Sequence, residues 1–152
     1  MKRMTRTLVV LILILGIIGV ANAQFSRPED AINYRQSVMF LIAQHFGRIA
    51  VVIQGQSPFD GDSVAQNAML VETLSKLPWD AFAVPGTDGG KTRLKSIAFA
   101  EPDQFRKAAS EFESASTKLA GAAKQGKLDA IKAPFGDVAK SCQSCHEQFR
   151  SQ

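Results

Sequence analysis

The chain has 152 residues, of which 45% are hydrophobic and 21% are charged, and its formal net charge is +4 with a sequence pI near 9.3. This composition excludes a disordered chain and allows one domain with a hydrophobic core. A pI this high is typical of proteins that bind nucleic acids or anionic membranes, so the location of the basic residues along the chain matters. Two cysteines are too few for a disulfide framework.

Much of the excess positive charge lies at the N-terminus. Three basic residues among the first six precede thirteen apolar or glycine residues at 8–20, and an Ala-Asn-Ala sequence ends at Ala23. This order is typical of a secretory signal peptide, which we predict to span residues 1–23 and to be cleaved after Ala23. Thirteen helical residues at ~1.5 Å each are too short to cross a hydrocarbon core of ~30 Å, which disfavours a membrane anchor.

The predicted mature protein is one domain at residues 24–152. Without the three basic residues of the signal peptide, 15 basic and 14 acidic side chains remain, which gives a net charge of +1. We therefore expect an exported protein, periplasmic in bacteria, with no nucleic-acid partner and no membrane contact in its mature form.

The first predicted helix runs from Pro28 to Ile53. Pro28 suits the first helical position, and the two acidic residues after it suit the positive end of the helix dipole. Seven positions recur at alternating spacings of three and four, which is typical of a helix in a bundle, although one of them carries a charge. They are Ile32, Arg35, Met39, Ile42, Phe46, Ile49 and Ile53. A break containing Gly55 and Pro58 follows.

A second amphipathic helix is predicted at about 60–77. Its apolar face carries Val64, Ala68, Val71 and Leu74, and Pro78 interrupts it. The next segment contains four glycine or proline residues at 85–90 and shows no strand-like alternation. We expect it to be a loop.

Two further helices complete the predicted fold. The first begins at Pro102 and has the apolar face Phe105, Ala108, Phe112, Ala115, Leu119 and Ala122. After Gly126, the spacing of three and four returns at Leu128, Ile131, Phe135, Val138, Cys142, Cys145 and Phe149. Pro134 predicts a kink or a later helix start. Four such helices predict an all-α four-helix bundle, whose facing helices could hold a cofactor.

The chemistry is concentrated in the run Cys142-Gln143-Ser144-Cys145-His146, which is the C-x-x-C-H pattern of c-type haem attachment. Residues three apart share one helix face, so both thiols can meet the two vinyl groups of one porphyrin, and the adjacent imidazole can ligate iron. A structural zinc would need four ligands, and His45 is the only further Cys or His that could join these three. A thioredoxin-like dithiol would need a βαβ context, which this sequence lacks. Both alternatives are therefore weaker than haem attachment. A haem-free structural bundle remains an alternative.

No nucleophile–base pair and no phosphate-binding loop is visible, so we expect no enzyme. His45 is the only other histidine and therefore the obvious candidate for a second axial ligand. It lies off the apolar stripe of its helix, which favours a surface or interface position.

With C-x-x-C-H near the C-terminus of an exported four-helix chain, the sequence resembles the class II c-type cytochromes, specifically the cytochrome c′ family, over essentially all of residues 24–152. In class I cytochromes c the motif lies near the N-terminus. The segments that carry the resemblance are Gln24-Phe25-Ser26-Arg27-Pro28-Glu29-Asp30-Ala31, Tyr34-Arg35-Gln36-Ser37, His45-Phe46-Gly47-Arg48, Leu77-Pro78-Trp79, Pro85-Gly86-Thr87 and Phe135-Gly136-Asp137-Val138 through Arg150.

The resemblance implies an antiparallel, left-handed bundle with one covalent haem c per chain, five-coordinate and high-spin, with His146 as the proximal iron ligand. It implies a distal pocket lined by Met39, Trp79 and Phe82. Family members bind NO and CO, discriminate against O₂, and are associated with NO tolerance and periplasmic electron transfer. NO can displace the proximal histidine and remain bound on the proximal face of the haem, near a basic residue that matches Arg150. Homodimers through the first two helices are common, and redox partners stay unknown.

Each of these roles has a plainer alternative. Met39 could simply pack in the core, or it could be the sixth iron ligand of a low-spin electron carrier of the c-556 type. Haem iron with a free sixth coordination position binds gases, whereas iron with six ligands carries electrons. Trp79 and Phe82 could be ordinary core aromatics, and Arg150 could be a solvated cation at a helix C-terminus.

Arg35 interrupts an apolar stripe, which is costly unless its charge is paired or reaches water. An internal ion pair with Asp or Glu would satisfy it. The family places an arginine here to pair with a haem propionate, and we favour that role.

Overall fold

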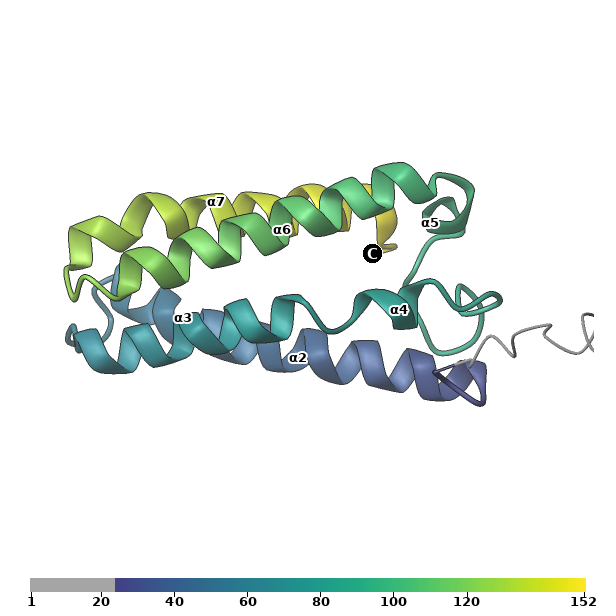
Figure 1. Cartoon of the computed structure of the whole chain (residues 1–152), viewed down its shortest axis with the longest axis horizontal. Helices are drawn as coiled ribbons and strands as arrows, with labels where there is room; N and C mark the ends of the chain where they lie inside the picture. Colours follow the sequence, from purple (N-terminus) through teal and green to yellow (C-terminus); the bar gives the residue numbers. More distant parts are fainter. Residues whose placement is uncertain (1–23) are drawn as a thin grey trace, which may run out of the picture.

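The computed structural model describes residues 24–152, so the predicted signal peptide lies outside the described residues (Figure 1). Four long helices and two single-turn helices make up this part of the chain. In chain order they are α2 (Pro28–Ile53), α3 (Gly61–Ser75), α4 (Trp79–Phe82), α5 (Ile97–Ala100), α6 (Pro102–Ala123) and α7 (Leu128–Phe149).

The four predicted long helices are present, with small differences at their ends. α2 has the predicted bounds, and α3 begins after Asp60, whose carboxylate accepts from the amides of Asp62 at 3.1 Å and Ser63 at 3.3 Å. This side-chain cap satisfies two of the free N–H groups of the first turn. The short helices α4 and α5 lie on either side of the predicted loop and were not predicted.

Of the two outcomes predicted for Pro134, a kink or a later helix start, the later start is wrong, because α7 begins at Leu128 and continues through Pro134. Pro134 is the seventh helical residue, so its nitrogen cannot donate to the Ala130 carbonyl, and its ring crowds that carbonyl. The apolar face of α7 packs along α6, and this burial holds the helix together across the missing bond.

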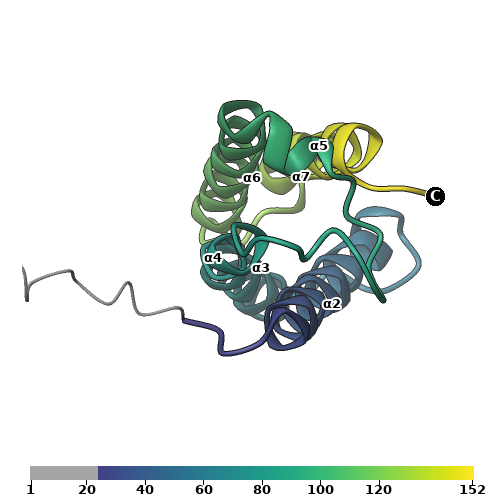
Figure 2. The same ribbon diagram turned by 90° about the vertical axis from the view of Figure 1, so that its right-hand side faces the viewer.

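The long helices form the predicted four-helix bundle (Figures 1 and 2). α2 and α3 form one antiparallel pair, and α6 and α7 form the other, with α6 packed against α3. Viewed along its long axis, the bundle places the first and last helices, α2 and α7, on the side opposite the α3–α6 contact (Figure 2).

The two halves of the bundle differ in packing. In the half near the α2–α3 and α6–α7 turns, Ile49, Leu119 and Ile131 form a core that is essentially inaccessible to solvent. Phe46 and Phe135 stack across it, with ring centroids 4.3 Å apart and planes 8° from parallel. The apolar stripes of the four helices meet here, so this half supplies much of the burial that stabilises the fold. The other half contains a large cavity.

Candidate haem-binding site

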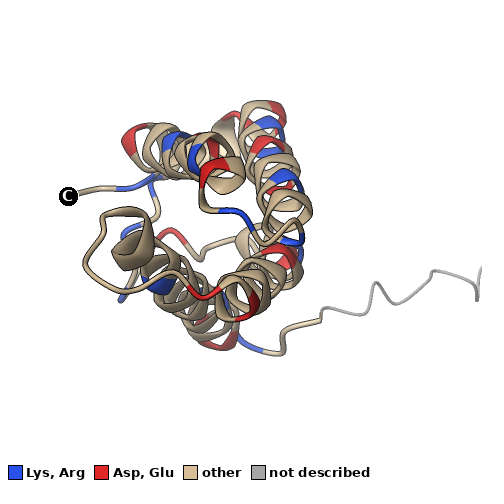
Figure 3. Ribbon diagram, turned by 90° about the vertical axis from the view of Figure 1, so that its left-hand side faces the viewer, with Lys and Arg blue, Asp and Glu red and all other residues tan. Residues whose placement is uncertain are grey.

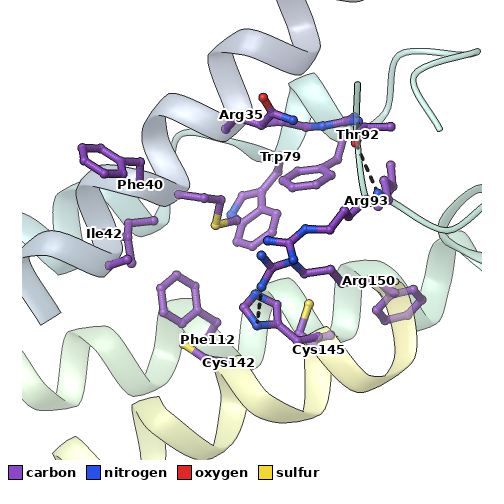
Figure 4. A pocket seen from close by; sticks show the side chains of 18 of the residues that line it. Arg35, Phe40, Ile42, Trp79, Thr92, Arg93, Phe112, Cys142, Cys145 and Arg150 are labelled. Atoms are coloured by element: carbon purple, nitrogen blue, oxygen red, sulfur yellow. Dashed lines mark hydrogen bonds between the residues drawn. The ribbon is translucent and has the colours of Figure 1, made fainter. Parts of the chain in front are cut away.

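The cavity lies between α2 and α7 and has a volume of about 960 Å³ (Figure 4). α4, α6 and the end of the loop after α4 close its remaining sides. This volume is at the upper end of the range for small-molecule and cofactor sites. All eight site residues proposed from the sequence line it: Arg35, Met39, Trp79, Phe82, Cys142, Cys145, His146 and Arg150.

Cys142 and Cys145 lie on the last turns of α7, one turn apart and therefore on one face. Both thiols are free and half-buried. Burial raises the pKa of the Cys142 thiol, and burial together with the neighbouring Cys142 raises the pKa of Cys145 to about 11. Redox-active dithiols depend instead on a lowered thiol pKa. The electrostatics therefore do not fit disulfide chemistry, whereas two neutral thiols on a cavity wall fit thioether attachment.

His146 lies beside two arginines. Burial, followed by the positive charge of Arg93, lowers the pKa of its imidazole, so the ring is neutral near pH 7 and able to act as a metal ligand. The Arg150 Nη1 atom is 3.4 Å from His146 Nδ1 (Figure 4). The sequence prediction missed Arg93, because a single arginine in an irregular loop has no periodic signal to place it.

Aromatic side chains make up most of the opposite wall. The Trp79 ring lies 5.9 Å from Phe82 and is edge-on to Phe105 and Phe112 of α6, with centroids 6.1 and 6.4 Å away. Met39 of α2 completes this wall and also contacts the buried core. The sequence analysis placed Phe105 and Phe112 on the apolar face of their helix but did not assign them to the pocket, since core and pocket aromatics share the same spacing.

The indole N–H of Trp79 is the one polar group within that aromatic cluster. Its Nε1 atom is buried and has no hydrogen-bond partner among the described residues. Because the nitrogen is fully covered even with the cavity open beside the ring, it does not present a donor to the cavity. The wall formed by Met39, Trp79 and Phe82 is therefore apolar toward a bound ligand.

Arg35 is almost completely buried, with 2% of its surface exposed. Burial lowers the pKa of its guanidinium, and the nearby charge of Asp88 partly opposes this effect. Its Nη1 atom donates to the Ala81 carbonyl at 3.2 Å and to Thr87 Oγ1 at 2.8 Å, and its Cζ atom lies 4.9 Å from the Phe82 ring centroid. Among residues 24–152, no carboxylate forms an ion pair with it.

His45 does not join the cavity. Its Nδ1 atom is 2.9 Å from Asn67 Oδ1 of α3, so the ring is engaged between α2 and α3. Within residues 24–152, no three His, Cys, Asp or Glu side chains form a metal-binding cluster.

Comparisons with known proteins give the family of this chain. A family model described as Cytochrome C′ matches residues 30–150. The cytochrome c′ of Alcaligenes xylosoxydans xylosoxydans is 43% identical over 127 residues, which cover 84% of this chain and 98% of that protein. The cytochrome c′ of Rubrivivax gelatinosus is 47% identical over 128 residues, with the same coverage of 84% and 98%.

Solved structures of these relatives share the fold. The Rubrivivax gelatinosus cytochrome c′ has a TM-score of 0.80 at 46% identity and covers 84% of this chain and all of its own. Two variants of the Alcaligenes xylosoxidans protein, one with carbon monoxide bound and one ferrous with NO bound, each have a TM-score of 0.79 at 41% and 40% identity. They cover 85% of this chain and 100% and 99% of their own. The chain belongs to the cytochrome c′ family.

Membership of this family implies a c-type haem, and the residues of the cavity fit one. Two thiols one turn apart and an adjacent neutral imidazole are the groups that attach and ligate a c-type haem, and the apolar patch on the facing wall suits its macrocycle. Cys142 and Cys145 would hold the haem covalently, and His146 would ligate its iron.

Proposed function

We propose that the chain carries one haem c, attached through Cys142 and Cys145 and ligated by His146, and that the distal side of the iron stays open for NO and CO. The observation that carries the proposal is the cavity itself. One wall presents the attachment motif, and the facing wall includes an apolar patch of Met39, Trp79 and Phe82 that presents no donor to the cavity.

The relatives indicate which class of ligand the iron would bind. Structures of the Alcaligenes xylosoxidans cytochrome c′ are described with carbon monoxide and with NO bound. With haem bound in the cavity, the iron would supply an electron-rich site that binds such diatomic gases. NO binds ferrous iron strongly without help, whereas bound O₂ needs a hydrogen-bond donor for stability. A wall of Met39, Trp79 and Phe82 therefore favours NO over O₂, which suits NO binding or detoxification.

A second candidate function is electron transfer with Met39 as the sixth ligand. Met39 lines the cavity opposite α7, so its thioether is on the correct side for this role. Its contacts with the core favour packing instead. A protein with an open iron can also take part in electron transfer, so the distinction concerns the sixth position and not redox activity as such.

Optical spectra of the purified protein separate the two functions. We expect high-spin ferric and ferrous spectra that shift when CO or NO is added. A low-spin spectrum that CO leaves unchanged, and that Met39→Leu converts to high-spin, would instead establish the electron carrier. Expression with haem maturation machinery that yields no Soret band would contradict both functions.

We also propose that Arg35 directs its charge to a haem propionate. The terminal nitrogens of Arg35 donate to uncharged oxygens of Ala81, Thr87 and Thr92, so its positive charge has no carboxylate partner among residues 24–152 and would be balanced by an anion that the cofactor brings to the cavity. Arg35→Leu should shift the reduction potential or weaken haem retention in the mature protein. An unchanged potential and unchanged retention would rule out the pairing.

Export to the periplasm is supported by the predicted signal peptide and by the C-x-x-C-H motif, because bacteria attach this haem after export. Intact mass measurement of protein from a periplasmic extract should give a chain that begins at Gln24 and carries one haem. A chain that still contains residues 1–23, or that stays in the cytoplasm, would contradict this part of the proposal.

A homodimer through α2 and α3 is supported by the apolar character of this surface. Exposed hydrophobic side chains include Leu41 at 43% and Val51 at 38% on α2, and Met69 at 50% on α3. Charges of both signs lie along the upper pair of helices, α6 and α7 (Figure 3). In α2, by contrast, the stretch 36–47 contains no Lys, Arg, Asp or Glu. α2 is the one described helix with the length and apolar composition to cross a membrane, yet it carries the buried Arg35 of the bundle.

Sedimentation of Met69→Glu tests this surface. A charge placed in an apolar interface should dissociate the dimer, because no partner in the interface compensates the free energy of its desolvation. Lys107→Glu, which changes an exposed side chain of α6, is the control and should sediment as the parent protein does. A parent protein that is monomeric at all concentrations would contradict the proposal.

A further inference from the structure

Arg35 holds the loop between α4 and α5 as well as facing the cavity. Its Nη2 atom donates to the Thr87 carbonyl and, at 2.9 Å, to Thr92 Oγ1. Together with the two bonds from Nη1, all four terminal guanidinium hydrogens therefore reach Ala81, Thr87 and Thr92. The neighbouring Gln36 adds a bond from its side-chain amide to the Lys91 carbonyl at 2.8 Å. α2 therefore holds one side of the loop through the hydrogen bonds of Arg35 and Gln36.

This loop has little means of holding its own shape. Gly86 and Gly90 have φ angles of +76° and +77°, which other residues rarely adopt, and no regular helix or strand spans 84–94. Thr87 is fully buried within it, and its hydroxyl both accepts from Arg35 and donates to the Val84 carbonyl at 2.8 Å. The hydroxyl of Thr87 therefore joins the guanidinium to the loop backbone.

The far end of the same loop is paired with the C-terminus. Leu94 and Arg150 form an antiparallel bridge. The Lys95 amide donates to the Phe149 carbonyl at 2.9 Å, and the Ser151 amide donates to the Arg93 carbonyl at 2.8 Å. These bonds fix the backbone on both sides of Arg150, the residue whose guanidinium lies beside His146.

We propose that Arg35 is a positioning residue which, through Thr87 and the loop, fixes Arg150 beside His146. One loop then connects the distal helix α2 with the proximal end of α7, and Gly90 to Leu94 of this loop line the cavity between them (Figure 4). The planar guanidinium is suited to this role because its four terminal donors reach three separate residues at fixed angles. A lysine at this position has one nitrogen and cannot span them.

Amide hydrogen exchange in the haem-loaded protein tests the connection through the backbone. Thr87→Val keeps the shape of the side chain but removes both bonds of the hydroxyl. We expect the Lys95 and Ser151 amides to exchange about fivefold faster, the size that fits the loss of a side-chain hydrogen bond that supports local structure. Arg35→Lys should accelerate the same two amides. Amides of the core, such as that of Leu119, should keep their rates.

Two control variants distinguish positioning from general destabilisation. Thr87→Ser keeps the hydroxyl and should retain the parent exchange rates. Thr73→Val removes a threonine hydroxyl bond to a backbone carbonyl on α3, that of Met69 at 2.9 Å, and should leave Lys95 and Ser151 unchanged. Equal acceleration of the loop and core amides in Thr87→Val, or unchanged rates at Ser151, would overturn the proposal.

The iron–histidine vibration of the ferrous protein provides a second readout. This readout alone rests on the proposed haem site, and a missing Soret band would count against that site and not against the loop connection. We expect the band to shift in Thr87→Val, because Arg150 moves relative to His146 Nδ1, and to return to its parent position in Thr87→Ser. A band that is the same in all three proteins would contradict the effect on the proximal side.

Discussion

The two walls of the cavity differ in the kind of group they present. The α2 and α4 wall offers Met39, Trp79 and Phe82, none of which presents a donor to the cavity, and the polar Arg35 and Gln36 of α2 bond to the loop after α4. The α7 wall carries two thiols and an imidazole with an arginine beside it. The first wall can act on a ligand through shape and the absence of hydrogen bonds, whereas the second acts through covalent and electrostatic chemistry.

This difference assigns separate tasks to the two sides. A change on the α7 wall should alter whether the cofactor is held and how strongly the imidazole binds iron. A change on the α2 and α4 wall should alter which gas is preferred, with the cofactor still in place. Substitutions that affect one property without the other can therefore test the assignment.

The largest effect is expected on the α7 wall. Replacing both Cys142 and Cys145 with Ser removes the sulfur atoms that form the thioethers, so covalent haem should be lost completely. Haem staining of denatured protein and intact mass measure this loss. Ser144→Ala, which changes an exposed residue between the two cysteines, is the control and should retain one haem per chain. Covalent haem that survives the double substitution would disprove the assignment of the motif.

Adding a donor to the apolar wall is expected to have the next largest effect. Met39→Gln keeps the length of the side chain but brings an amide N–H toward the ligand. One additional hydrogen bond should raise the O₂ affinity of the ferrous protein about tenfold. Met39→Leu, which adds no donor, should leave that affinity low. Equal O₂ affinities in the two variants would show that selection against O₂ does not depend on the missing donor.

Arg150 should influence the strength of the proximal bond. A metal-bound histidine usually donates its second N–H to a carboxylate or carbonyl, which strengthens it as a ligand, and a cation 3.4 Å from Nδ1 has the opposite effect. In Arg150→Gln we therefore expect NO to replace the histidine about threefold less often, consistent with the modest energy of a partly exposed charge.

Optical spectra of the ferrous protein under NO measure that replacement. Arg48→Gln removes one exposed positive charge from α2, away from the cavity, and is the matched control. If the two variants show the same change, the effect arises from net charge and not from the position of Arg150.

Periodic features of the sequence predicted most of the fold and much of the site. The alternating spacing of three and four located α2 and α7, since helix faces repeat along the chain and burial selects apolar residues on them. The spacing of Cys142 and Cys145 predicted the attachment motif, and the structure places both thiols on the cavity wall. The placement of Met39, Trp79 and Phe82 at one cavity came from the family resemblance, and the structure brings them together there.

The loop between α4 and α5 could not be predicted in the same way. Thr87, Thr92 and Arg93 have no periodic relation to one another, and their positions depend on partners about 50 residues away in the sequence. The bridge from Leu94 to Arg150 has no strand-like pattern, because a single residue pair forms it. The stripe position of Arg35 indicated that its charge needed a partner but did not show that backbone carbonyls and threonine hydroxyls would supply its contacts.

The smallest expected effect concerns Lys95, next to the bridge. Its Nζ atom donates to the carbonyls of Glu147 at 2.9 Å and Gln148 at 3.3 Å, at the negative end of the α7 dipole. Lys95→Met should lower the free energy of unfolding by about 0.5 kcal/mol, the usual size for a cation at a helix C-terminus. Urea unfolding measures this change, with Lys118→Met on the exposed face of α6 as the control.

The same variant separates charge from backbone pairing at the end of α7. Lys95→Met keeps the amide that donates to the Phe149 carbonyl, so the bridge and the position of Arg150 should remain. The iron–histidine band should then match that of the parent protein although stability falls. A shifted band would mean that the lysine charge, and not the pairing of the loop with the C-terminus, sets the surroundings of His146.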